Sequence, residues 1–164
     1  MKIIPDNTME RPRRKNYPIH CIECGRKEVY PAVVRETLER NHDGRIYELA
    51  IDDLPAAKCR SCGAVSYDLE SDDRIVAELR RHLSLLTPER IRANLAALHL
   101  TQREAAEGLG IAAETLSRWL SGGLIQSRAM DNLLRAFFGS AAVRSGLMNA
   151  KRRRKFGEKI GGTA

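Results

Sequence analysis

Two short cysteine motifs are the part of this sequence whose residue types and spacing indicate chemistry. Each motif has two residues between its cysteines, so one tight turn can present both sulfur atoms to a single ion. A glycine follows each pair and permits the positive φ that such a knuckle turn requires. Together the knuckles supply four thiolates, the closed tetrahedral shell of structural zinc. The sequence therefore predicts one structural Zn²⁺ bound by Cys21, Cys24, Cys59 and Cys62.

The alternatives to a structural zinc site are disulfide bonds, a redox site and a catalytic zinc site. Disulfides are disfavoured in a reducing cytosol. A thioredoxin-like redox site needs one Cys-x-x-Cys motif in a βαβ setting, not two paired knuckles. Catalytic zinc keeps an open position for water, which four thiolates do not leave. His20 precedes Cys21 and is an alternative ligand, although a solvated histidine is more common beside such a motif.

A second pattern, in residues 101–123, is typical of a helix-turn-helix. Thr101 and Glu104 can form a capping box at the start of its first helix. Gly110 can adopt the left-handed conformation that ends this helix. The second helix is expected at about 113–120, and in this architecture it enters the major groove of DNA. The alternative is an αα-hairpin without a DNA role. Apolar positions expected in the core are Ile111, Leu116, Trp119, Met130, Leu133, Leu134 and Phe137.

The elements that must position these motifs form an α+β fold, with a small β-rich zinc module followed by an all-helical domain. In the first module, a hairpin with its turn at residues 41–44 would lead from one cysteine pair to the other. Ser71 is expected to cap the helix that follows, and a last bundle helix is expected over 127–138. The expected domains are a flexible basic arm (1–18), a zinc-binding domain (19–70), a connecting helix (71–86), a helix-turn-helix domain (87–140) and a basic C-terminal tail (141–164).

Length and composition limit the class of protein. The chain has 164 residues, of which 43% are hydrophobic and 30% charged, a balance typical of one or two small globular domains. A bilayer span needs about 18 apolar residues, and no run approaches that length. The N-terminus lacks the apolar stretch of about 7–15 residues that a signal peptide requires. The sequence thus predicts a cytoplasmic protein with no membrane association.

The net charge of +7 is distributed unevenly. Residues 21–70 carry 7 basic and 10 acidic side chains, whereas residues 151–164 carry 6 basic and 1 acidic. A strongly basic end favours a polyanionic partner such as DNA. The alternative is a tail that only aids solubility.

The sequence does not favour an enzyme. Acidic pairs occur at 52–53 and 72–73. Adjacent residues of a strand point to opposite faces, and a helix start accommodates acidic residues through its dipole. No Gly-x-x-x-x-Gly-Lys loop is present to cradle a phosphate.

The motifs resemble known families. TQREAAEGLGIAAETLSRWLSGG, residues 101–123, is similar to the Xre/Cro-type repressors, and the paired CxxCG motifs with their hairpin resemble the YgiT-type zinc finger. In this order, over about residues 19–140, they resemble the MqsA family of type II antitoxins. The resemblance implies a DNA-binding antitoxin that neutralises a toxin RNase, represses its own operon, binds zinc and dimerises through its helical domain. The alternative is an Xre-type regulator without a toxin partner.

The resemblance also implies DNA contacts. Gln102 matches a glutamine that contacts a phosphate, and Arg118 matches a base-reading arginine of the recognition helix. Glu114 stands where the family more often has a neutral amide, and a carboxylate can accept from cytosine N4 but repels phosphates. Ala112 replaces the usual Ser or Thr cap. The alternative for Arg118 is a solvated helix arginine. The predicted DNA-contacting residues are Gln102, Ala113, Glu114, Thr115, Arg118 and Ser121, on the operator's major groove.

Overall fold

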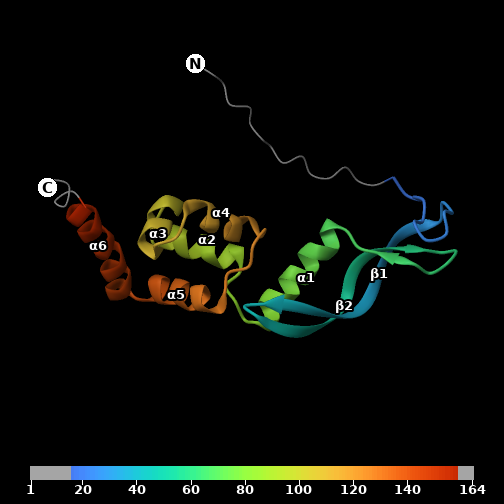
Figure 1. Ribbon diagram of the computed structural model, residues 1–164, viewed down its shortest axis with the longest axis horizontal. Helices are drawn as coiled ribbons and strands as arrows, with labels where there is room; N and C mark the ends of the chain where they lie inside the picture. The colour runs from blue at the N-terminus through green and yellow to red at the C-terminus, as the bar shows by residue number, and fades with distance from the viewer. Residues whose placement is uncertain (1–15, 159–164) are drawn as a thin grey trace, which may run out of the picture. The chain divides into compact units, whose positions relative to one another are not determined.

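The computed structural model describes residues 16–158, with side chains over 16–149 (Figure 1). Its elements are β1 (Val29–His42), β2 (Arg45–Cys59), β3 (Val65–Ser66), α1 (Leu69–His82), α2 (Pro88–Ala97), α3 (Gln102–Leu109), α4 (Ala113–Ser121), α5 (Arg128–Gly139) and α6 (Ala141–Glu158). The predicted α+β class is confirmed. Two compact units comprise residues 16–35 with 52–72, and 36–51 with 73–158. Within the described part, no helix is long and apolar enough to cross a membrane. Most of the expected N-terminal arm, residues 1–15, lies outside the described residues.

A long β-hairpin forms most of the sheet, whose strand order is β1-β2-β3. Its turn residues, Asp43 and Gly44, have φ values of 52° and 72°. Two successive positive φ angles define a type I′ turn, whose twist matches that of the flanking strands. The predicted hairpin is confirmed, and β2 runs on to Cys59. The hairpin therefore delivers the chain directly to the second cysteine pair.

Helix α1 begins and ends earlier than the sequence predicts. The expected N-cap, Ser71, lies in the first turn and is fully buried, and its hydroxyl donates to the Pro55 carbonyl at 2.7 Å. Asp68 caps the helix instead, because its Oδ1 accepts hydrogen bonds from the backbone N–H groups of Glu70 and Ser71. The Ser71 prediction is therefore wrong, since that hydroxyl bonds to β2. The helix ends at His82, and residues 83–87 form an irregular linker to α2.

Helices α2 to α5 enclose a common apolar core. Thr87 caps α2 and Pro88 is its first residue, as predicted. Ser127 caps α5 through its hydroxyl. At the same helix start, the Asp43 carboxylate of the hairpin turn accepts a hydrogen bond from the Arg128 N–H at 2.7 Å. The buried core consists of Leu86, Ile91, Leu95, Ala105, Ala106, Leu109, Leu116, Trp119, Leu120, Leu134 and Phe137.

Helix α6 occupies residues for which the sequence suggested a basic tail beyond the bundle. It contacts α3 and α5, and its Leu147 and Met148 pack against the bundle core. The approach is close because Gly108 of α3 has no side chain: a Cβ there would lie 2.9 Å from Phe137 Cε2 and 3.1 Å from Met148 Cγ. The helical conformation continues to residue 158, and the side chains of residues 151–155 lie outside the described ones.

Candidate metal centre and nucleic-acid interface

The two cysteine motifs adopt the same backbone conformation. In the first, the Gly25 N–H donates to the Cys21 carbonyl at 2.9 Å, and in the second the Gly63 N–H donates to the Cys59 carbonyl at 2.9 Å. Both glycines lie in the left-handed region, at φ 72° and 79°, where a side chain would be strained. Each motif is thus a knuckle turn, which orients its two sulfur atoms toward one point.

The knuckles bring all four sulfur atoms together. Every Sγ atom lies within 4.8 Å of the others, and the four residues are free cysteines. The Sγ–Sγ distances are 3.6 Å between Cys21 and Cys62 and 3.7 Å between Cys24 and Cys59. Ligands about 2.3 Å from a tetrahedral zinc ion are about 3.8 Å apart. The four cysteines are therefore positioned to bind one metal ion, and their all-thiolate tetrahedral set fits structural Zn²⁺ with no position left for substrate.

Backbone N–H groups and neighbouring sulfurs shift the pKa values of two of the thiols in opposite directions. Hydrogen bonding from the Cys62 backbone N–H lowers the pKa of Cys59 to about 7. The Ala64 backbone N–H lowers the pKa of Cys62, but burial and the three neighbouring sulfurs outweigh it and raise that pKa to about 12. Four sulfurs at this spacing do not ionise together without a compensating charge. A bound dication would supply that charge.

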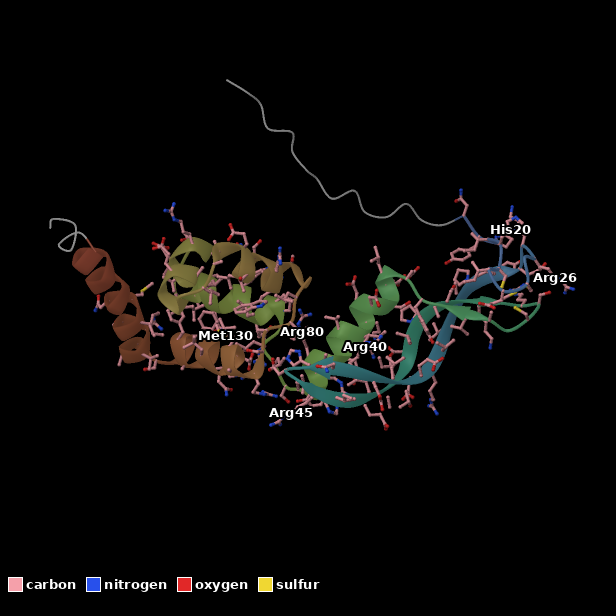
Figure 2. The ribbon with its side chains drawn as sticks, viewed as in Figure 1. His20, Arg26, Arg40, Arg45, Arg80 and Met130 are labelled. Carbon is pink, nitrogen blue, oxygen red and sulfur yellow. The ribbon has the colours of Figure 1, made fainter. Side chains whose placement is uncertain are left out.

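The surroundings of the cluster are partly apolar. Cys21 and Cys59 are buried with Val29 and Ala57, and the partly buried Tyr17, Ile19 and Ala64 pack against them. His20, labelled in Figure 2, is exposed, and its Nδ1 lies 3.0 Å from the Gly25 carbonyl oxygen, a hydrogen-bonding distance. The geometry of the site therefore assigns the ligand role to the four sulfurs rather than to His20.

The helix-turn-helix has the local structure that its sequence predicts. Thr101 and Glu104 form both bonds of the capping box, and hydrogen bonding from the Thr101 side chain lowers the pKa of Glu104. Gly110 ends α3 at φ 72°. Ala112 is the N-cap of α4, and its methyl side chain accepts no capping hydrogen bond. The Thr115 N–H in the first turn of α4 therefore has no side-chain acceptor at the cap and donates to the Ala112 carbonyl at 3.1 Å.

Helix α4 separates an apolar face from a polar one. Leu116, Trp119 and Leu120 are buried in the bundle core, whereas Arg118 is exposed. The predicted contact residues lie on or beside the exposed face, with Gln102 at the first position of α3. The exposed ones are Gln102, Ala113, Glu114, Arg118 and Ser121, and Thr115 is half-buried.

Two arginines that sequence reasoning missed hold the end of α4. Arg80 of α1 donates to the carbonyls of Gly122 and Leu124, and Arg92 of α2 donates to the Leu120 carbonyl. Both arginines would be interpreted from sequence as solvated helix residues. No local pattern distinguishes them, because their partners lie 28 to 44 positions away along the chain.

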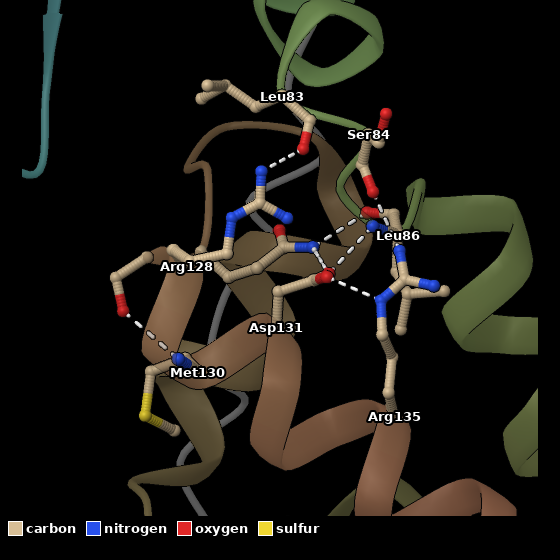
Figure 3. A network of polar contacts seen from close by, with 9 residues as sticks. Leu83, Ser84, Leu86, Arg128, Met130, Asp131 and Arg135 are labelled. Atoms are coloured by element: carbon tan, nitrogen blue, oxygen red, sulfur yellow. Dashed lines mark hydrogen bonds and ion pairs between the residues drawn. The ribbon is translucent and has the colours of Figure 1, made fainter.

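A buried polar network holds the linker between α1 and α2 against α5 (Figure 3). The Asp131 carboxylate accepts hydrogen bonds from the Leu86 N–H, from Gln126 and from Arg135. Gln126 also donates to the Leu86 carbonyl at 2.7 Å. Both backbone groups of Leu86 are thereby satisfied away from water, as buried polar groups require.

A four-cysteine module positioned to bind a metal ion, followed by a helix-turn-helix bundle, defines this class of protein. The family model described as the antitoxin component of a bacterial toxin-antitoxin system, MqsA, matches residues 19–138. This chain therefore belongs to the MqsA antitoxin family.

Comparison with curated proteins finds no match. Among solved structures, the chain is similar to the "putative DNA binding protein NE0471" from Nitrosomonas europaea. The two share 14% identity with a TM-score of 0.36, over 67% of this chain and 88% of that one. At this TM-score and sequence identity, no function is inferred from the similarity.

Proposed function

We propose that this chain is an antitoxin that binds operator DNA through α4, represses its own operon and neutralises a toxin RNase in the cytoplasm. The observation that carries the DNA-binding part is the division of α4 into two faces. Leu116 and Trp119 anchor one face in the core, and Arg118 projects from the other. A helix held in this way can enter the major groove with its polar side toward the base edges.

Each predicted contact residue has a role that its chemistry allows. Gln102 would bind a phosphate at the start of α3, and the N-terminal N–H groups of α4 would bind another. Arg118 would donate two hydrogen bonds to guanine O6 and N7, and Glu114 would accept from cytosine N4. Thr115 would contact a thymine methyl group or a phosphate. Ala113 and Ser121 are at the two ends of the helix.

A symmetric dimer fits this mode of binding. One recognition helix covers only a few base pairs, and two half-sites about 34 Å apart double the contact. We therefore expect a homodimer on a pseudo-palindromic operator, formed through the helical domain. Mass measurement in solution, with and without DNA, tests this, and a monomer under both conditions would contradict it.

Substitution of Arg118 tests the DNA-binding role. We expect Arg118→Ala to weaken binding to the DNA upstream of the protein's own gene by about 1–3 kcal/mol, the value of one bidentate base contact. Binding to scrambled DNA should weaken much less. Arg45→Ala is the matched control, because Arg45 is also exposed but lies on β2. Equal losses of affinity for both DNAs would show that Arg118 contacts only phosphates. No loss for either DNA would show that α4 does not enter the groove.

The toxin is best sought in the neighbouring gene. If its product is a small basic RNase, we expect this chain to bind it and inhibit RNA cleavage, through the metal module rather than through α4. Arg118→Ala should then leave toxin inhibition unchanged. Absence of any such partner would favour the alternative, an Xre-type regulator without a toxin.

A further inference from the structure

Arg80 is a buried cation at the carboxyl end of the recognition helix. It lies near the end of α1, only 6% exposed, and is labelled in Figure 2. Its Nη2 donates to the Leu124 carbonyl at 2.9 Å and to the Gly122 carbonyl at 3.2 Å. These carbonyls follow α4 at the negative end of its dipole. One guanidinium therefore binds the turn in which α4 ends.

The same turn is bonded directly to Arg118. The Leu124 N–H donates to the Arg118 carbonyl at 3.2 Å, and the Ser121 hydroxyl donates to that carbonyl at 3.1 Å. Leu124 thus connects the two arginines: its carbonyl accepts from Arg80 and its N–H donates to the backbone of Arg118. A movement of the 122–124 turn would change the position of Arg118.

The burial of Arg80 is not explained by stability alone. Burial lowers the pKa of Arg80, since its charged form is separated from water. Among the described residues, its Nε has no hydrogen-bond partner although it is buried. Even buried ion pairs are often replaced by apolar residues of similar volume without loss of stability, so a buried charge is weak evidence of a stabilising role. A charge kept in such a place favours a role in fixing one conformation.

We propose that Arg80 is a positioning residue for sequence recognition, which holds the 122–124 turn and thereby the position of Arg118 on the base edge. This inference rests on the proposed DNA-binding function of α4. Arg80 acts through the backbone and does not touch DNA itself. Its contribution is therefore to the choice between DNA sequences rather than to general affinity for phosphates.

The test is a double-mutant cycle between Arg80→Met and Arg118→Ala in the full chain. For each protein, affinity is measured for the DNA upstream of its own gene and for scrambled DNA. We expect Arg80→Met to reduce the ratio of the two affinities about tenfold, within the range that one bidentate base contact supplies. In the Arg118→Ala background, Arg80→Met should leave this ratio unchanged. Arg45→Met removes the same charge from an exposed site and should leave the ratio unchanged in both backgrounds.

Amide hydrogen exchange gives a readout without DNA. Arg80→Met should speed exchange of the Leu124 N–H and leave the exchange rate of the capping-box N–H of Glu104 unchanged. Arg80→Lys keeps the charge without the planar fork, and we expect an intermediate affinity ratio. If Arg80→Met does not fold, the test uses Arg80→Lys instead. An affinity ratio unchanged from the wild type in Arg80→Lys would then overturn the proposal.

The outcomes distinguish a failure of the Arg80 positioning role from a failure of the DNA-binding role of α4. If Arg118→Ala changes the ratio but Arg80→Met does not, or if Arg80→Met acts equally in both backgrounds, Arg80 is a structural residue only. If Arg118→Ala itself leaves the ratio unchanged, the DNA-binding role of α4 is wrong and the positioning role is overturned with it.

Discussion

Asp131 Oδ1 lies 2.7 Å from the backbone nitrogen of Leu86, and this hydrogen bond joins α5 to the linker before α2. Asp131 is completely buried. Its second oxygen accepts from Arg135 Nε at 2.7 Å, and Arg135 also donates to the Ser84 carbonyl. One carboxylate therefore organises a linker that forms no helix or strand of its own.

Replacing this carboxylate should destabilise the helical bundle. Asp131→Asn keeps the shape but removes the charge, and its amide hydrogens would face donors. Hydrogen bonds to charged groups contribute about 1.5–3 kcal/mol each, so we expect the free energy of unfolding to fall by about 2–3 kcal/mol. Urea unfolding of the wild type and of Asp131→Asn measures this decrease in the free energy of unfolding. A decrease below about 0.5 kcal/mol would contradict a central role for the network.

The same residue should make stability depend on pH. Burial opposes ionisation of Asp131, but hydrogen bonds from Leu86, Arg135 and Gln126 outweigh burial and lower its pKa. Its contribution is then complete above the ordinary aspartate pKa of about 3.9 and is lost as the pH falls from that value through the lower pKa of the folded state. Unfolding measured from pH 6 downward should show a difference between wild type and Asp131→Asn that narrows in acid. A difference independent of pH would show that the carboxylate is not the cause.

Gly108 should not tolerate a side chain. A Cβ there would lie 2.9 Å from the ring of Phe137, which is fully buried in the core. We expect Gly108→Ala to lower the melting temperature, at a cost of about 1–3 kcal/mol. Gly146→Ala in α6 is the matched control, because nothing lies within 4 Å of its Cβ position. The control should be neutral or stabilising by up to about 1 kcal/mol, and equal behaviour of the two variants would exclude the packing explanation.

Metal removal should unfold the knuckles before the helical bundle. Structural zinc in small peptides contributes about 10–16 kcal/mol of apparent binding free energy at neutral pH, more than a small module's own stability. We expect chelation or Cys59→Ser to remove backbone order around the two motifs while the α2–α5 core stays protected from hydrogen exchange. Re-addition of Zn²⁺ should restore the wild type only. A metal-free protein with unchanged knuckles would contradict the prediction.

The basic end of the chain should add DNA affinity without sequence preference. Truncation after Ala150 retains Leu147 and Met148, which pack on the core, but removes the basic run 151–155. We expect weaker binding to specific and scrambled DNA alike. The dependence of log affinity on log salt concentration should become shallower by about 0.9 for each phosphate that the truncated chain no longer neutralises. Truncation after Glu158 keeps the run and should retain the wild-type slope. A change in base preference would instead make this segment a groove reader.

The sequence alone determined the parts of this protein whose causes are local. The knuckles depend on two cysteines, two intervening residues and a glycine, all within one turn. The capping box of α3 and the left-handed Gly110 likewise depend on neighbours three to four positions apart. The exposed position of Arg118 follows from helical periodicity once Leu116 and Trp119 are assigned to the core.

Only the tertiary structure decided which polar side chains hold the elements together. Asp43 and Arg128 are 85 positions apart, and Asp131 and Leu86 are 45 apart. A serine that looks like a helix cap, Ser71, bonds to β2 instead. A segment that looks like a tail forms α6, whose Met148 packs where Gly108 has no side chain. Hydrogen bonds and close packing act between atoms that are close in space. The periodicity of the sequence does not indicate which residues far apart in the chain come into contact.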